Sequence, residues 1–379
     1  SYFGVTLYDY PAGVASSGHV ISNNKFQDLG TYNDPAPPAT NINFWGGGVL
    51  LYNNQYTAVT NNCMTNVRIG VQTGNFYAAN PGSSASQVIS GNTIEARRRG
   101  IFHNLFYGSA SSYTLSGNII TGAMNANESV WDGILIGSQA VASTATNNIV
   151  NGAGITNPSE GIEVWNSLPA PTVSGGNISG VNIGVSVNNY EGYISNANNT
   201  AAVIDGVTIS SVTTAGIKVH DNPLNTNGAT VFAEVKNTTI TGGATGILVS
   251  GADATADIHN NPSNITLSGI GIDADGGTAT VYRNNLTANG IGIRATNGGK
   301  LTSVTENFIT NSTSDGIRIT PTAGVIGNIN VNDLSGSGSK AINNQSAATL
   351  AATCNWYGAT LPATVATKIS GPVTYINYL

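Results

Sequence analysis

Few side chains in this sequence could do acid–base chemistry, and the most suggestive of them lie in three neighbouring repeats. Asp132 and Glu160 each stand just before a Gly-Ile pair, at the same step of two successive repeats. If these repeats stack as adjacent strands, the two carboxyl groups would lie about 5 Å apart, near the separation in a retaining glycosidase. Arg99, one repeat earlier, would extend the stripe. Asp132, Glu160 and Arg99 are therefore the candidate catalytic residues, and the alternative is an exposed ion-pair ladder worth little energy.

Aromatic residues near this stripe could bind a sugar. Trp131 lies beside the stripe, and Trp165 lies two residues after Glu163, on the side of the strand that we expect to point outward. Because aromatic faces can stack on sugar rings, we take Trp131, Trp165, Glu163 and His103 as candidate ligand-binding residues. The alternative is that these aromatic side chains only pack local insertions against the coil body.

Other polar groups carry weaker signals. Lys218, His220 and Asp221 form a small cluster, which is more simply interpreted as solvated. Asp273 and Arg294 share an outward position in successive repeats, so we expect a salt bridge. There is no zinc-type Cys/His spacing and no phosphate-cradling Gly-x-x-x-x-Gly-Lys sequence, so we predict no metal site and no cofactor. Calcium is the one further candidate, although the regular glycine-aspartate nonapeptide is absent, and its ligands would be Asp253, Asp257, Asp273 and Asp275.

Two short phrases alternate along the chain and must position all of these residues. One is a polar step with Asn before apolar residues, as in Gly91-Asn92-Thr93-Ile94; the other is Gly-Ile/Val-x-Ile/Val, as in Gly216-Ile217-Lys218-Val219. Successive Gly-Ile phrases lie roughly 21 to 33 residues apart, the period of a stacked solenoid coil. Short alternating segments bounded by Gly and Asn predict strands, and no segment keeps a helical period.

One such coil cannot bury its own apolar face, so the repeats predict a stack of coils about 4.8 Å apart. Ile217 should then point inward and Lys218 outward. Asn recurs at one step of each coil because it tolerates a left-handed bend and can hydrogen-bond to the Asn of the next coil. We interpret these residues as a structural asparagine ladder.

On these phrases the chain resembles the right-handed parallel β-helix family, the pectate-lyase-like solenoids, along essentially its whole length. The resemblance implies an all-β solenoid of about 13 coils over residues 1–355, with long insertions such as Gly30–Phe44 and Asn75–Ser84 in the N-terminal half and short regular coils afterwards. Residues 356–379 would close the fold. The phrase Cys354-Asn355-Trp356-Tyr357-Gly358 looks like the closing piece of β-helix modules in long secreted surface proteins of Bacteroidota.

The amino-acid composition limits the kinds of partner that this chain could bind. Only 8% of the 379 residues are charged, against about 25% in an ordinary domain, and 13 Lys and Arg cannot supply the basic surface that nucleic acid requires. No apolar run is long enough for a membrane-spanning helix, so we expect no membrane insertion. A surface of Asn, Thr, Ser and Gly suits an extracellular or cell-surface protein. Because Gly4-Val5-Thr6-Leu7 already matches the strand phrase, we expect a piece of a larger polypeptide or a chain capped by a neighbour.

Three functions follow from these observations. The favoured one is a noncatalytic extracellular module, a structural spacer or adhesin segment of a larger secreted or cell-surface protein. Its partners would be further domains of the same polypeptide, neighbouring surface proteins or glycans. The first alternative is a polysaccharide lyase, hydrolase or epimerase with a cleft on the N-terminal coils. The second is a subunit of a filament assembled end to end.

Overall fold

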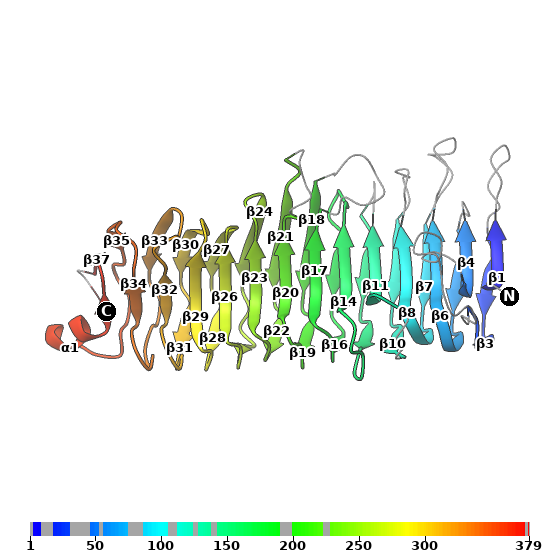
Figure 1. The fold of residues 1–379 in the computed structure, drawn as a ribbon, viewed down its shortest axis with the longest axis horizontal. Coiled ribbons are helices and arrows are strands. Elements are labelled where there is room, and N and C mark those ends of the chain that lie inside the picture. Colours follow the sequence, from blue (N-terminus) through cyan, green and yellow to red (C-terminus); the bar gives the residue numbers. More distant parts are fainter. Residues whose placement is uncertain are drawn as a thin grey trace. The chain divides into compact units, whose positions relative to one another are not determined.

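The computed structural model shows a chain built almost entirely of short parallel strands (Figure 1). Each strand pairs in register with the strand at the same step of the next coil, which is the arrangement of a right-handed parallel β-helix. The prediction of an all-β solenoid is therefore confirmed. The strands divide into a first unit, Ser1–Asn182, and a second unit, Ile183–Leu379. The structure describes residues 3–8, 18–30, 46–52, 56–74, 86–104, 112–123, 128–137, 142–189, 199–222, 228–375 and 378.

A coil of the first unit begins with a short strand, turns at a polar step and continues along a longer strand. β7 (Gln87–Ser90) leads into β8 (Thr93–Asn104), and the chain returns through β9 (Tyr113–Ser116), which pairs with β7. The expected insertions at Gly30–Phe44 and Asn75–Ser84 lie, apart from Gly30, outside the described residues. The other strands of this unit are β1 (Phe3–Tyr8), β2 (Val20–Ser22), β3 (Lys25–Gln27), β4 (Gly47–Tyr52), β5 (Ala58–Thr60), β6 (Cys63–Gly74), β10 (Ile119–Gly122), β11 (Trp131–Gly137), β12 (Thr144–Thr146), β13 (Ile149–Asn151), β14 (Ser159–Trp165), β15 (Thr172–Ser174) and β16 (Asn177–Ser179).

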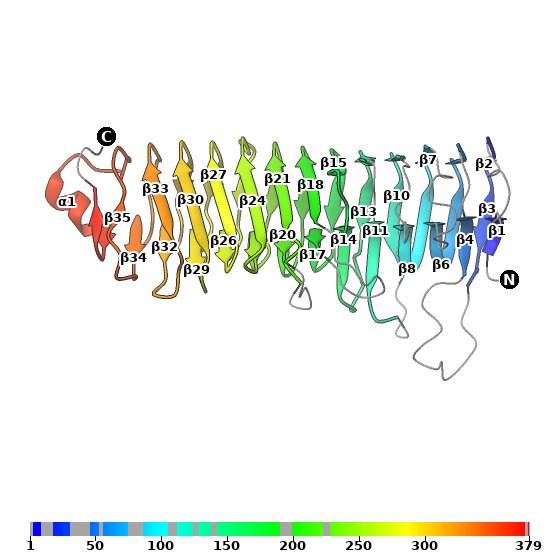
Figure 2. The same cartoon turned by 90° about the horizontal axis from the view of Figure 1, so that it is seen from above.

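Coils of the second unit repeat three separate strands. β21 (Val231–Lys236), β22 (Thr239–Thr241) and β23 (Thr245–Ser250) form one coil, and β24 (Ala254–His259) begins the next, paired with β21. Figure 2 shows the strands of this unit side by side. The others are β17 (Ile183–Asn188), β18 (Thr200–Asp205), β19 (Thr208–Ser210), β20 (Ala215–His220), β25 (Ile265–Thr266), β26 (Ile270–Asp275), β27 (Thr278–Tyr282), β28 (Asn285–Thr287), β29 (Ile291–Thr296), β30 (Lys300–Thr305), β31 (Phe308–Thr310), β32 (Ile317–Ile319), β33 (Ile326–Asn330), β34 (Ile342–Asn344) and β35 (Leu350–Ala351).

A short helix lies beside the last coil of the second unit (Figure 2). Helix α1 (Pro362–Thr367) starts with a proline, which needs no hydrogen-bond partner for its nitrogen at that position, and it buries Val365 completely. After it, β36 (Ile369–Ser370) pairs with β34, and β37 (Val373–Thr374) pairs with β35. The segment after the helix thus continues the parallel pairing of the coils.

Aliphatic side chains form columns inside the coils. Ile217 is in register with Ile247, and both are 0% exposed, whereas Lys218 between the inward positions is half-exposed. The alternation predicted for the Gly-Ile phrase is confirmed. The glycine has a packing reason, because a Cβ at Gly216 would lie 2.5 Å from Cγ2 of Ile240. The phrase therefore lets a strand of one coil pack closely against an isoleucine of the next coil.

Buried asparagines link successive coils at the polar turn. Asn307 donates from its backbone N and from Nδ2 to Oδ1 of Asn332, both at 3.0 Å. The same Nδ2 donates to the backbone O of Val281, and Oδ1 of Asn307 accepts from Asn284. The predicted side-chain ladder is confirmed. Its members are Asn24, Asn62, Asn92, Asn118 and Asn148 in the first unit, and Thr238, Asn261, Asn284, Asn307, Asn332 and Asn355 in the second.

The residue before each ladder position has a left-handed backbone that turns the chain. Most coils place Asn or Gly there, such as Asn61 at φ 55° and Gly91 at φ 64°, and these two residue types tolerate that conformation best. Late coils use other residues, among them Glu306 at φ 57° and Val331 at φ 58°. A β-branched side chain is strained in this region, so Val331 is held there by the pairing of its neighbours.

Replacing Asn307 by alanine should lower the free energy of unfolding by about 3 kcal/mol, because buried partners in two neighbouring coils would lose their hydrogen bonds. Urea denaturation followed by circular dichroism measures this change. Asn328, which is exposed on β33, supplies the control, and Asn328→Ala should change the same quantity by less than about 0.5 kcal/mol. Equal losses in the two variants would contradict the structural role of the ladder.

Replacing Val331 by asparagine should raise the free energy of unfolding by about 1 kcal/mol, because it removes a β-branched side chain from a left-handed position. The midpoint of thermal unfolding should rise accordingly. Val325 is also exposed, at 74%, and is not among the residues with positive φ, so Val325→Asn should have little effect. A lower midpoint for Val331→Asn would show that the left-handed valine carries no strain.

Candidate functional site

The three candidate catalytic residues occupy one register line across β8, β11 and β14. Arg99 is in register with Asp132, and Asp132 is in register with Glu160. The alignment expected from the repeat is therefore present. Nε of Arg99 lies 2.7 Å from Oδ2 of Asp132, and the guanidinium lies over the ring of Phe102, 4.5 Å from its centroid. The side chains of Arg99 and Asp132 are only 11% and 5% exposed.

This pairing limits what the stripe can do. A glycosidase needs both carboxyl groups facing the scissile bond, but here the Asp132 carboxylate is paired with the Arg99 guanidinium. Glu160 is half-buried on the neighbouring strand. A pair held within the coil surface in this way suits a structural tie between strands better than proton transfer to a substrate.

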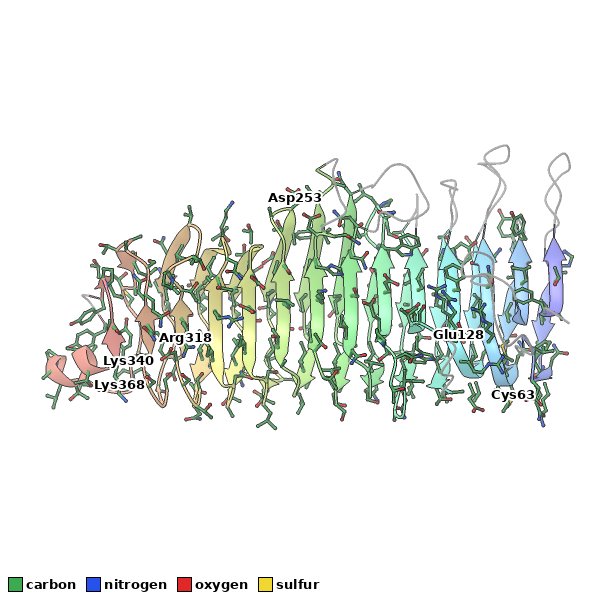
Figure 3. The ribbon with its side chains drawn as sticks, viewed as in Figure 1. Cys63, Glu128, Asp253, Arg318, Lys340 and Lys368 are labelled. Carbon is green, nitrogen blue, oxygen red and sulfur yellow. The ribbon has the colours of Figure 1, made fainter. Side chains whose placement is uncertain are left out.

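A second ion-pair network lies next to this stripe. The carboxylate of Glu128, marked in Figure 3, accepts two hydrogen bonds from Arg68, from Nε to Oε1 at 2.5 Å and from Nη2 to Oε2 at 2.9 Å. Arg98 Nη1 lies 3.4 Å from the same carboxylate. Burial, together with the nearby positive charges of Arg99 and Arg68, lowers the pKa of Arg98 to about 10. Bidentate pairing of buried arginine and glutamate fixes the segment before β11 against β6 and β8.

Both candidate tryptophans are buried. Trp131 is 0% exposed, and its Nε1 donates to the backbone O of Ala96 at 2.9 Å. Its ring lies over Gly122 and Gly152, where any Cβ would be 3.3 Å from the indole. Trp165 is 5% exposed. The structure thus corrects the expectation that these indoles present open faces to a sugar, because small residues in neighbouring coils leave room for the ring to pack inward.

The other two candidate ligand residues have different environments. His103 is 0% exposed and faces the coil interior, where its Nδ1 lies 2.5 Å from Oγ1 of Thr73 and its ring centroid lies 3.5 Å from that of Tyr113. Burial raises the pKa of Tyr113. Glu163 is half-exposed on β14. His103 therefore belongs to an interior polar cluster, which corrects its placement among surface residues.

The cluster at Lys218, His220 and Asp221 includes a serine that sequence reasoning missed. Oγ of Ser186 lies 3.5 Å from Nε2 of His220, and Oδ1 of Asp221 accepts from Nδ2 of Asn189 at 2.8 Å. Burial and the positive charge of Lys218 lower the pKa of His220 to about 3, while Asp221 acts in the opposite direction. A histidine with this pKa is a poor general base near neutral pH. The signal for Ser186 was its outward position in the Gly-Val-x-Val phrase.

A further polar cluster lies on β21, β24 and β27. Oε1 of Glu234 accepts from Nζ of Lys236 at 2.9 Å and from Nε2 of His259 at 3.1 Å. The His259 ring stacks on Tyr282 at 4.8 Å between centroids. The hydrogen bond from Lys236 lowers the pKa of Glu234. Alternating polar residues in aligned strands could have revealed this cluster, which resembles the cross-strand pairs that stabilise a sheet.

The candidate calcium ligands are engaged elsewhere or lie apart. Arg294 binds Asp273 through two contacts, at 2.7 and 3.0 Å, so the expected salt bridge is present. Asp275 accepts from Asn297 at 2.8 Å. Within the described part of the chain, no group of three or more His, Cys, Asp or Glu side chains could hold a metal ion. Cys63, marked in Figure 3, and Cys354 are free cysteines.

An open hollow of about 630 Å³ lies at the turn face of late coils in the second unit. Phe308 and Trp356 line this hollow, and Asp333 lies between them in the strand register. The ion pair of Arg283 and Glu306, with Nε and Oε2 2.6 Å apart, also lines it. We call it the Phe308–Trp356 hollow. Phe308 is 60% exposed. Sequence reasoning missed this site because it judged the late coils by their lack of insertions.

Searches found no matching protein-family model, no similar curated protein and no similar solved structure. Among the helices that the structure describes, none is long and apolar enough to cross a membrane.

Acidification should reveal the buried state of His220. Its folded-state pKa of about 3 lies below the ordinary value of 6.5, so the unfolded chain takes up the proton first as the pH falls, and stability is lost from about pH 6.5 downward. Between pH 7 and pH 4 the wild type should lose about 3 kcal/mol more than His220→Gln. Urea denaturation at the two pH values measures the difference, and parallel losses would contradict the burial of the neutral imidazole.

Proposed function

We propose that this chain is a noncatalytic structural module, a spacer or adhesin segment of a larger secreted or cell-surface protein. The observation that carries the proposal is the use made of polar side chains. Buried asparagines bond to the next coil, and charged residues such as Arg99, Asp132 and Glu128 bond to one another across strands. These side chains tie coils together instead of converging on a substrate.

The wider context of the module belongs to the same proposal. The low charge and the Asn-, Thr-, Ser- and Gly-rich surface support an extracellular or cell-surface location. The closing phrase at Cys354–Gly358 supports a place among the pectate-lyase-like β-helix modules of Bacteroidota surface proteins. Its partners would be further domains of the same polypeptide or neighbouring surface proteins.

One observation favours the alternative of a polysaccharide lyase, hydrolase or epimerase. Arg99, Asp132 and Glu160 share a register line on adjacent strands of the first unit, which is the arrangement that a carboxylate pair with a basic neighbour would require. Against this, the Arg99–Asp132 contact is mostly buried, and the nearby indoles of Trp131 and Trp165 are covered. An exposed cleft for a sugar chain would need them open.

The purified chain should show no turnover on polyuronates, pectin or neutral plant and algal glycans. Release of reducing ends reports hydrolysis, and the absorbance of unsaturated uronates reports lyase activity. Activity that disappears in Asp132→Asn or Glu160→Gln would overturn the noncatalytic proposal and support an enzyme. Glu95→Gln, at a half-exposed position on the same strand as Arg99, serves as the matched control.

A further inference from the structure

The Phe308–Trp356 hollow is organised by strand register. Asn285 is in register with Phe308, Phe308 with Asp333, and Asp333 with Trp356. The two aromatic residues are therefore two coils apart, on the order of 10 Å. Their side chains stand in a single row along the stack of the second unit, with a carboxylate between them.

Two apolar side chains at this hollow are exposed, and Trp356 beside them is half-buried. Phe308 is 60% exposed and the adjacent Val331 is 47% exposed, although the inward positions of the same coils, such as Ile309, are completely buried. Single exposed apolar residues are ordinary, but two of them beside a half-buried tryptophan at one hollow point to an interaction surface.

The charges around the hollow nearly cancel. The side chains of Arg283 and Glu306 are 59% and 46% exposed and pair with each other. Asp333 adds one carboxylate, whose Oδ1 accepts from the backbone N of Ser335 at 2.9 Å. This balance offers no surplus positive charge for a polyanion, so it suits a neutral ligand with hydroxyl groups.

We propose that the Phe308–Trp356 hollow binds an extended, neutral, β-linked polysaccharide along this row. One hexose of such a chain spans about the distance between coils, and alternate rings present the same face. Phe308 and Trp356 would each stack on the C–H face of a sugar ring. Asp333 and Asn285 would bond to hydroxyl groups beside those rings. The site does not depend on the spacer role, since binding is measured separately from turnover.

Isothermal titration of the whole chain with cellohexaose, chitohexaose and mannohexaose tests the proposal. At least one of these neutral chains should bind, and Phe308→Ala and Trp356→Ala should each weaken that binding about tenfold. Trp356→Tyr keeps an aromatic ring and should retain most of the affinity. Ile119 is 42% exposed and follows a ladder asparagine in the first unit, so Ile119→Ala is the matched control and should bind as the wild type does.

Four results would overturn the proposal. One is the absence of binding by all three neutral chains, and another is unchanged affinity in Phe308→Ala. The third is tighter binding of an alginate hexasaccharide than of any neutral chain, because the hollow has no excess of positive charge. Self-association that Phe308→Ala abolishes, without glycan binding, would assign the hollow to a protein partner and would likewise overturn it. Hydrolysis of a bound chain would contradict the noncatalytic module alone.

Discussion

A buried amide side chain must find hydrogen-bond partners, and in this protein those partners lie in the neighbouring coils. A ladder asparagine inside the row donates forward to the next asparagine and back to a strand carbonyl, as Asn284 does to Asn307 and Ile258. A coil shifted by one residue would leave these groups unpaired in the interior, at a large cost. The ladder therefore fixes the register on which both the aliphatic columns and the surface rows depend.

Once the register is fixed, outward residues at the same step become neighbours. Oppositely charged pairs follow directly, as with Arg99 and Asp132 in the first unit and Asp273 and Arg294 in the second. Such cross-strand pairs add modest stability. In these pairs the arginine neutralises the carboxylate on the neighbouring strand. Alignment of two carboxylates in successive coils is therefore not enough to make a catalytic pair. The same rule produces the Phe308–Asp333–Trp356 row, where an aromatic residue lies on each side of Asp333 and Phe308 remains exposed.

The clusters of polar side chains in this chain thus arise largely from its repeated coils. A solenoid multiplies whatever residue stands at one step, so clusters arise on every face without selection for a reaction. The pairs at His220 and Ser186 and at His259 and Glu234 resemble parts of catalytic sites, yet each contact joins residues in neighbouring coils. What separates a binding surface from such clusters is exposure together with a hollow, and Phe308 combines both, with the half-buried Trp356 lining the same hollow.

The sequence by itself determined the strands, the inward position of Ile217, the asparagine ladder and the alignment of Arg99 with Asp132 and Glu160. These features depend only on alternation within a strand and on equal positions in successive repeats, which a single sequence displays. The tertiary structure alone decided which outward side chains remain exposed. Trp131 is covered because Gly122 and Gly152 leave space for its ring, whereas Phe308 at the start of β31 lines an open hollow and stays exposed. Burial depends on the volume of residues in other coils, and that volume is not encoded at the position itself.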